Sequence, residues 1–145
     1  MTTDTAKKII KEARVLLGIP YKYGTKEEDI PQYLDCSSFT QYVFKKVTGK
    51  DIGRSTILQA TQGETVLEKD LQPGDLIFFR GSKGHFNDSL FPPEKYGYDI
   101  CIGHVAIYIG NGIAIHASGE KGKVIEETVE EIKKTRVRIP IIKRI

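Results

Sequence analysis

Hydrophobic positions near the N-terminus recur at the spacing of an amphipathic helix. Apolar residues fall on one side of this helix, and lysine and arginine residues fall on the other. Gly18, followed by Pro20, is a stop signal. The pattern predicts a helix that covers the core through its apolar positions: Ile9, Ile10, Ala13, Leu16 and Leu17.

A second helical pattern begins at Cys36. Asp35 is a good N-cap, Leu34 and Phe39 stand at the two hydrophobic-staple positions, and Gly49 is a natural terminator. We therefore predict that Cys36 is the first residue of a buried helix. The positive end of a helix dipole favours a thiolate, so this position predicts a lowered cysteine pKa. A small apolar residue packed at the helix start is the alternative interpretation.

The rest of the chain predicts a third short helix and then strands. Thr56 and Gln59 have capping-box spacing, and Gly63 ends that helix. Helices followed by a meander of strands indicate an α+β fold, with the helices packed on one side of an antiparallel sheet. The polar stretch 81–103 is expected to be a long excursion that includes a solvated His85. Strands are predicted at 76–80, 104–109, 113–118, 123–126 and 136–142.

The segment HVAIYIGNGIAIH, residues 104–116, is typical of two apolar strands around an Asn-Gly turn. The register decides where its histidines point, because side chains alternate along a strand. A two-residue turn would place His104 and His116 on opposite faces. A three-residue loop, with Gly112 as the left-handed residue of a type I turn plus bulge, gives one wholly apolar face and puts both histidines on the other. We predict this second register, in which Ala106 pairs with His116 and the histidines are diagonal neighbours.

Composition bounds the function classes. The chain has 145 residues, of which 39% are hydrophobic and 28% charged, and this fits a single domain over residues 1–145. The net charge of +3 comes from scattered basic and acidic residues, so a nucleic-acid partner is not expected. No apolar run is long enough to cross a bilayer, and no secretory signal is visible. The two cysteines, Cys36 and Cys101, form no disulfide framework.

If the start of the second helix faces the polar side of the hairpin, a thiol lies beside a pair of imidazoles. This arrangement of Cys36, His104 and His116 predicts nucleophilic acyl transfer. His104 would take the thiol proton, the thiolate would attack a carbonyl, and the imidazolium would return the proton to the leaving amine. His116 would fix the tautomer of His104 in place of the usual Asp or Asn. The amides of Cys36 and Ser37 at the helix start would contribute to an oxyanion hole.

Five motifs, in order, resemble the NlpC family of bacterial cell-wall cysteine endopeptidases, a branch of the papain-like clan. The resemblance implies a papain-like α+β fold and hydrolysis of peptide bonds in peptidoglycan stem peptides or muropeptides, typically the bond between γ-linked D-glutamate and a diamino acid. It carries the nucleophile onto Cys36, the general base onto His104 and the third polar residue onto His116. It also implies oxyanion or substrate contacts for Tyr21, and for Arg54 in the third motif. The motifs are GIPYKYG, DCSSF, GRSTILQ, LQPGDLIFF and GHVAIYIGNGIAIHAS.

Three departures from the family pattern bear on specificity. Ser38 stands where the family usually has Gly, a change that this helical position tolerates. Arg54-Ser55-Thr56 replaces the Arg-Asp-Ser triplet whose Asp recognises a free amine, which favours stem peptides still attached to glycan. The stretch 81–103 is longer than the family's usual loop and is expected to cover the groove.

Alternatives of other classes stay open at this point. Cys36, Cys101, His104 and His116 are potential metal ligands, but the Cys-x2-His spacing of Cys101 and His104 is a weak pattern. A catalytically silent wall-peptide binding module is a second alternative, and a papain-like amidase or acyltransferase acting on another substrate is a third. The favoured interpretation is a peptidase, expected to be a monomer, that needs no metal or cofactor. Cys101 is expected to be buried at the start of a strand, from which it could form a disulfide with Cys36 under oxidation.

Overall fold

The computed structural model describes residues 1–80, 85–86, 91–96, 101–136 and 138–145. The helices are α1 (Thr3–Val15), α2 (Cys36–Thr48), α3 (Thr56–Gln59), α4 (Pro93–Tyr96) and α5 (Val129–Arg136), and short 3-10 turns lie at Glu27–Asp29 and Glu68–Asp70. The strands are β1 (Glu64–Thr65), β2 (Leu76–Phe79), β3 (His85–Phe86), β4 (Cys101–Ile102), β5 (His104–Gly110), β6 (Ile113–Ser118), β7 (Lys123–Thr128) and β8 (Ile141–Arg144).

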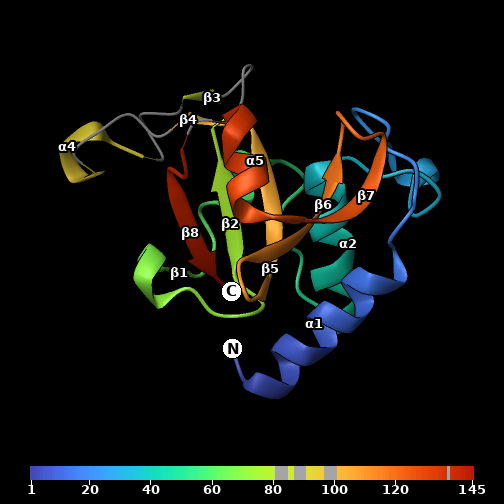
Figure 1. The fold of residues 1–145 in the computed structure, drawn as a ribbon, viewed down its shortest axis with the longest axis horizontal. Helices are drawn as coiled ribbons and strands as arrows, with labels where there is room; N and C mark the ends of the chain where they lie inside the picture. Colours follow the sequence, from blue (N-terminus) through green and yellow to red (C-terminus); the bar gives the residue numbers. More distant parts are fainter. Residues whose placement is uncertain (81–84, 87–90, 97–100, 137) are drawn as a thin grey trace.

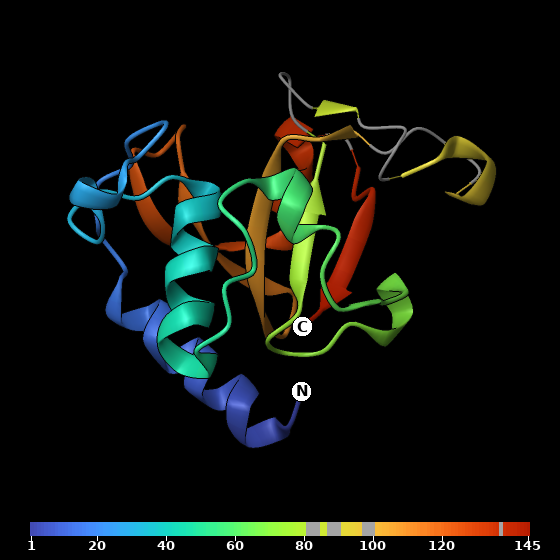
Figure 2. The same ribbon diagram turned by 180° about the vertical axis from the view of Figure 1, so that it is seen from behind.

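A six-stranded sheet in the order β1-β8-β2-β5-β6-β7 forms the centre of the molecule. Every neighbouring pair of its strands is antiparallel. Helices α1 and α2 pack on one face of this sheet, and α5 crosses the other face (Figures 1 and 2). The predicted α+β class, with N-terminal helices against an antiparallel sheet, is confirmed. The expectation that all helices lie on one side is wrong, because α5 was not predicted.

The two faces of the sheet bury two separate hydrophobic clusters. The larger cluster joins α1 and α2 to the sheet through large side chains such as Phe39, Phe44 and Phe78, none of which is exposed to solvent. The smaller cluster joins α5 to the other face through Val129 and Ile132. Both faces of the central strand β2 are therefore covered, and all of its residues are buried, as its apolar sequence predicted. No helix among the described residues is long and apolar enough to span a membrane.

Helix α1 confirms most of its predicted buried face. Ile9, Ala13 and Leu16 are buried, and α1 has its N-cap at Thr2. Leu17 lies just beyond the helix and is 40% exposed, so its predicted core position is wrong. Gly18 has φ of +90°, so the helical path ends where the sequence predicted.

The β5–β6 hairpin has the predicted register where it carries the histidines. Ile107 pairs with Ile115 and Tyr108 pairs with Ala114, which places His104 and His116 on the same face. The turn itself differs from the prediction. Gly110 pairs with Ile113 around a two-residue Asn-Gly turn, in which both residues have positive φ, and a bulge between Tyr108 and Gly110 absorbs the extra residue.

Three details of the later elements correct the sequence analysis. Ser55, not Thr56, caps α3, because its hydroxyl accepts the Leu58 N–H. Residues 129–136 form α5, and the last strand begins only at Ile141, after Pro140, so the strand predicted at 136–142 is too long. Most of the excursion at 81–103 lies outside the described residues. Within it, His85 belongs to the short strand β3, which pairs with β4.

Candidate active site

Asp35 fixes the start of α2 as predicted. Its carboxylate accepts the Ser38 backbone N–H at 2.8 Å, and the Ser38 hydroxyl accepts the Asp35 N–H at 2.9 Å, which completes a reciprocal capping box. Leu34 and Phe39, at the staple positions, are both fully buried. Cys36 is consequently the first helical residue, and its backbone N–H has no partner within the helix.

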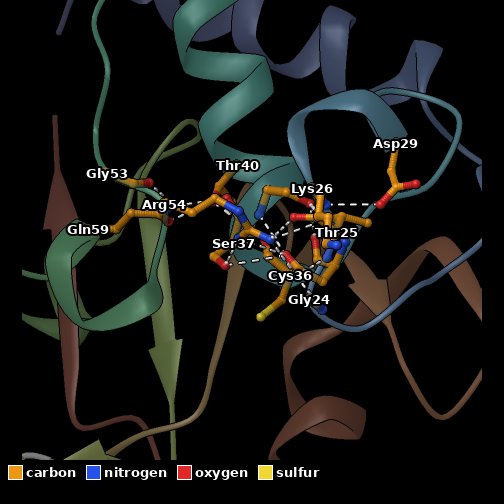
Figure 3. Close-up of polar contacts among 12 residues, drawn as sticks. Gly24, Thr25, Lys26, Asp29, Cys36, Ser37, Thr40, Gly53, Arg54 and Gln59 are labelled. Carbon is orange, nitrogen blue, oxygen red and sulfur yellow. Dashed lines mark hydrogen bonds and ion pairs between the residues drawn. The ribbon is translucent and has the colours of Figure 1, made fainter.

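Arg54 ties the start of α2 to the neighbouring loop (Figure 3). Its guanidinium donates to both carboxylate oxygens of Asp35, at 2.8 and 3.2 Å, and to the Ser37 hydroxyl at 2.8 Å. It also donates to the Thr25 carbonyl at 2.7 Å. Burial raises the pKa of Asp35, but the guanidinium and the Ser38 amide outweigh this effect and hold the pKa below its usual value. The Arg54 guanidinium and the Ser37 hydroxyl therefore both have hydrogen-bond partners within the protein.

Gln59 locks α3 against the same helix. Its amide donates to the Ser37 and Gly53 carbonyls, both at 2.9 Å, and its oxygen accepts the Thr40 hydroxyl at 2.6 Å. The side chain is fully buried, so these bonds satisfy a polar group that would otherwise be costly to bury. Gln59 is therefore a cross-link between α2 and the loop that carries Arg54, and not the capping-box residue that its spacing from Thr56 predicts.

His104 and His116 form the predicted pair on the sheet. His104 Nε2 lies 2.7 Å from His116 Nδ1, and the rings meet edge to face. Both side chains are buried, with 3% and 4% of their surface exposed. On its far side, His116 Nε2 lies 3.0 Å from Glu127 Oε1 on β7. Burial, reinforced by His116, lowers the pKa of His104 well below its usual value, so the ring is neutral at pH 7.

The thiol and the imidazole share one cleft of about 400 Å³. Cys36 and His104 both line it, together with Tyr21 and with Arg136 from the end of α5. The Cys36 sulfur points away from the Arg54 contacts (Figure 3). The structure thus brings Cys36 and His104 to one cleft, but not across the polar face of the hairpin. Helix α2 packs on the apolar face instead, and both residues line the cleft beside the first residue of β5.

The resting thiol is protonated. Burial, followed by the nearby Asp35 charge, raises the pKa of Cys36 to about 11, although the backbone amides of Val105 and Ser37 and the Arg136 charge act in the opposite direction. The prediction of a lowered cysteine pKa is therefore wrong, because burial outweighs the position at the helix start. Burial also raises the pKa of Tyr21 to about 12, so its hydroxyl stays a hydrogen-bond donor at neutral pH.

The second cysteine and a second hollow lie apart from this cleft. Cys101 is buried in β4, as expected, and both cysteines are free thiols. Among the described residues, no group of three or more His, Cys, Asp or Glu is placed to hold a metal ion. A larger hollow, of about 640 Å³, lies beside Gln41 and Lys45 of α2 and is lined by neither Cys36 nor the histidines.

Two residues of this region were missed by the sequence analysis. Glu127 lies just beyond the strand predicted at 123–126, and it shares the face of His116 only because β7 pairs with β6 in this register. Arg136 ends α5, a helix whose signals were present in the sequence. Acidic residues occupy its first turn and basic residues its last turn, and the Thr128 hydroxyl accepts the Glu131 N–H at its start.

The chain is similar to a known protein family in both sequence and structure. The family model described as NlpC/P60 family matches residues 18–89. The structure of the NlpC/p60 domain of peptidoglycan hydrolase SagA superposes with a TM-score of 0.70 at 31% identity, covering 97% of this chain and 98% of that one.

Two curated relatives are longer proteins. The murein DD-endopeptidase MepS/murein LD-carboxypeptidase of Escherichia coli K12 is 31% identical over 92% of this chain and 60% of its own length. The gamma-DL-glutamyl hydrolase of Bacillus subtilis is 29% identical over 89% of this chain and 27% of its own length. This chain therefore spans less than two thirds of either relative.

Proposed function

Because the chain belongs to the NlpC/P60 family, we propose that it is a cysteine endopeptidase that cleaves peptidoglycan stem peptides, at the bond between γ-linked D-glutamate and a diamino acid. One observation carries the proposal. The Cys36 thiol and the His104 imidazole line the same cleft, and His104 is hydrogen-bonded to His116 at 2.7 Å. A thiol, an imidazole and a group that orients the imidazole are the parts that acyl transfer needs.

The first step is a proton transfer within the cleft. His104 Nε2 is engaged by His116, so its other ring nitrogen, Nδ1, is the one available to the thiol. Cys36 is a neutral thiol at rest, and the low pKa of His104 keeps the ring neutral and able to accept a proton. As the sulfur attacks the substrate carbonyl, the thiol proton passes to Nδ1. His104 then gives this proton to the leaving amine, and water hydrolyses the thioester with His104 again as base.

The negative charge that develops on the substrate's carbonyl oxygen during attack must be stabilised by hydrogen-bond donors. The backbone N–H of Cys36 is free of intrahelical partners, and the Tyr21 hydroxyl lines the same cleft and stays protonated. We assign these two groups to the oxyanion. Gly119 allows Tyr21 to lie there, because a Cβ at this glycine would come within 3.3 Å of the ring. Ser37 and Arg54 line the same cleft, and their bonds to Asp35 and Thr25 also hold the helix start in place.

The charge in the cleft favours an acidic substrate. Arg136 is a cation whose field partly opposes the raised pKa values of Cys36 and Tyr21, and no ion pair is recorded for it within the described part of the chain. A γ-linked D-glutamate keeps its α-carboxylate free, on the same residue as the scissile carbonyl, and Arg136 would attract this carboxylate. The Bacillus subtilis relative is named a gamma-DL-glutamyl hydrolase, which supports hydrolysis at a γ-linked glutamyl group. The DD-endopeptidase named in Escherichia coli makes a D,D bond the alternative outcome.

A digest with product identification tests this function. Purified peptidoglycan and defined muropeptides are incubated with the intact protein, with Cys36→Ala and with Cys101→Ala, and the fragments are identified by mass spectrometry. Cys101 is the matched control, since it is the other free cysteine and, buried in β4, lines no part of the cleft. We expect cleavage after γ-D-glutamate by the intact protein and by Cys101→Ala only. Cleavage of a D,D bond would correct the specificity, and no Cys36-dependent cleavage of any stem peptide would refute the function.

A further inference from the structure

We propose that Glu127 is a positioning residue that acts through His116 to fix the tautomer and the proton affinity of His104. The proposal rests on the function proposed above, because it assigns a role within the same reaction. The geometry that carries it is the line of contacts from Glu127 Oε1 to His116 Nε2, 3.0 Å, and from His116 Nδ1 to His104 Nε2, 2.7 Å.

The sheet register places Glu127 where it can act in this way. Glu127 on β7 pairs with Ala114 on β6, and His116 pairs with Ile125. Pairs two residues apart share a face, so Glu127 and His116 are diagonal neighbours on the face that carries His104. The Glu127 side chain is 21% exposed, so the carboxylate is held at the rim of the buried pair with water nearby. The two imidazoles behind it are buried, with 3% and 4% of their surface exposed.

The contacts decide which ring nitrogens carry protons. A carboxylate only accepts hydrogen bonds, so Glu127 requires the proton of neutral His116 to sit on Nε2. His116 Nδ1 is then an acceptor, and the 2.7 Å contact requires His104 to hold its proton on Nε2. His104 Nδ1 is left bare. This is the nitrogen that must take the thiol proton, so the carboxylate sets the base in its reactive tautomer through two hydrogen bonds.

The charge of Glu127 also favours the protonated base. When His104 becomes an imidazolium, its Nε2–H bond to His116 strengthens, and His116 passes that polarisation on to the carboxylate. Burial lowers the pKa of His116, and the hydrogen bond to Glu127 works against that effect. The other charged groups that face the pair are Glu120, which raises the pKa of His116, and Arg136, which lowers it. Glu127 is the anion in direct contact.

Two substitutions separate orientation from charge. Glu127→Gln keeps an oxygen that accepts from His116 and removes only the charge, whereas Glu127→Ala removes both. Glu126→Gln is the matched control, because this neighbouring glutamate points to the opposite face and pairs with Arg14 at 3.3 Å. Its removal changes the net charge equally without touching the histidines.

The readouts are chosen so that no peptidoglycan is needed. Two-bond ¹H–¹⁵N spectra of the histidine rings report which nitrogen is protonated, and the rate of Cys36 alkylation by iodoacetamide against pH reports proton transfer to His104. We expect both rings of the wild type to be Nε2–H tautomers. We expect Glu127→Gln to keep these tautomers but alkylate about tenfold more slowly at neutral pH, as loss of a charged hydrogen-bond partner implies. Glu127→Ala should mix the tautomers and alkylate more slowly still.

Several results would overturn the role of Glu127. If the spectra show that His116 of the wild type is protonated on Nδ1, the role of Glu127 is refuted. This test needs only the wild-type protein, so it holds even if Glu127→Ala fails to fold. Equal alkylation profiles for wild type, Glu127→Gln and Glu126→Gln would refute the role as well. These outcomes are independent of the substrate. If the protein cleaves no stem peptide but shows the expected tautomers and rates, the proposed function fails and the role of Glu127 stands.

Discussion

Replacing Arg54 by Met tests whether this residue holds the active-site helix or contacts the substrate. Met keeps most of the aliphatic volume and removes the guanidinium, so the Asp35 carboxylate, only 6% exposed, loses its cationic partner. The bonds at 2.8 and 3.2 Å to Asp35 and at 2.8 Å to the Ser37 hydroxyl disappear together. The Asp35 cap on Ser38 remains, so we expect a loosened helix start and not an unfolded protein.

The size of the effect follows from the burial of the pair. Breaking a buried ion pair by removing one partner costs about 3–5 kcal/mol, because the other charge stays buried. The Arg54 side chain is 40% exposed, so solvent already screens part of the interaction. We therefore expect Arg54→Met to lower the free energy of unfolding by about 2–3 kcal/mol. For a domain of this size that corresponds to a fall in Tm of about 5–10 °C.

Thermal unfolding without substrate, followed by circular dichroism across pH, measures this loss. In the wild type the pKa of Asp35 is lowered, so its stabilisation is complete above the unfolded pKa and is lost as pH falls through the folded pKa. Without Arg54, burial instead disfavours the charged carboxylate, so the deficit of the variant should shrink as Asp35 is protonated. Arg14→Met is the control, because its ion pair with Glu126 is exposed. A normal Tm combined with a raised KM would refute the reasoning and return Arg54 to substrate binding.

Further predictions concern the cleft and one turn. Tyr21→Phe should lower kcat about a hundredfold with little change in KM, since it removes an oxyanion donor, and an unchanged kcat in steady-state assays would exclude that role. Because burial lowers the pKa of His104 well below 6.5, the acidic limb of kcat/KM should lie below that pH, and a limb near neutrality would contradict the neutral buried base. Gly63→Ala should lower Tm strongly, because its Cβ would clash with the backbone carbonyl oxygen of Arg144. Gly112→Ala, with φ of +75° and open space around it, should lower the free energy of unfolding by only about 1–2 kcal/mol through backbone strain.

The sequence predicts well where local rules decide the structure. The cap at Asp35 and the alternation of β5 and β6 depend only on nearby residues, so the positions of Cys36, His104 and His116 on their elements were confirmed. The turn has two residues instead of the predicted three, but the bulge between Tyr108 and Gly110 restores the predicted pairing before the strand reaches His104.

The errors arise where distant residues decide the outcome. The thiol pKa depends mainly on the burial of the Cys36 side chain in the folded protein, which outweighs its position at the helix start. The bonds of Arg54 join residues 19 and 29 positions apart in the sequence, so no short pattern could distinguish a clamp from a substrate contact. Glu127 reaches the histidines only because β7 pairs beside β6, which is a property of the sheet order.

The measurement that tests the central claim most directly is the intact mass of the protein during turnover. A defined stem peptide with an L-Ala-γ-D-Glu–diamino acid sequence is mixed with the protein, quenched in acid within the first turnovers, and mapped by peptide mass spectrometry. We predict a transient mass gain equal to the L-Ala-γ-D-Glu acyl group, as a thioester on Cys36, which decays as the diamino-acid fragment and free acid accumulate. Hydrolysis without any acyl adduct on Cys36, or undiminished hydrolysis by Cys36→Ala, would contradict the account.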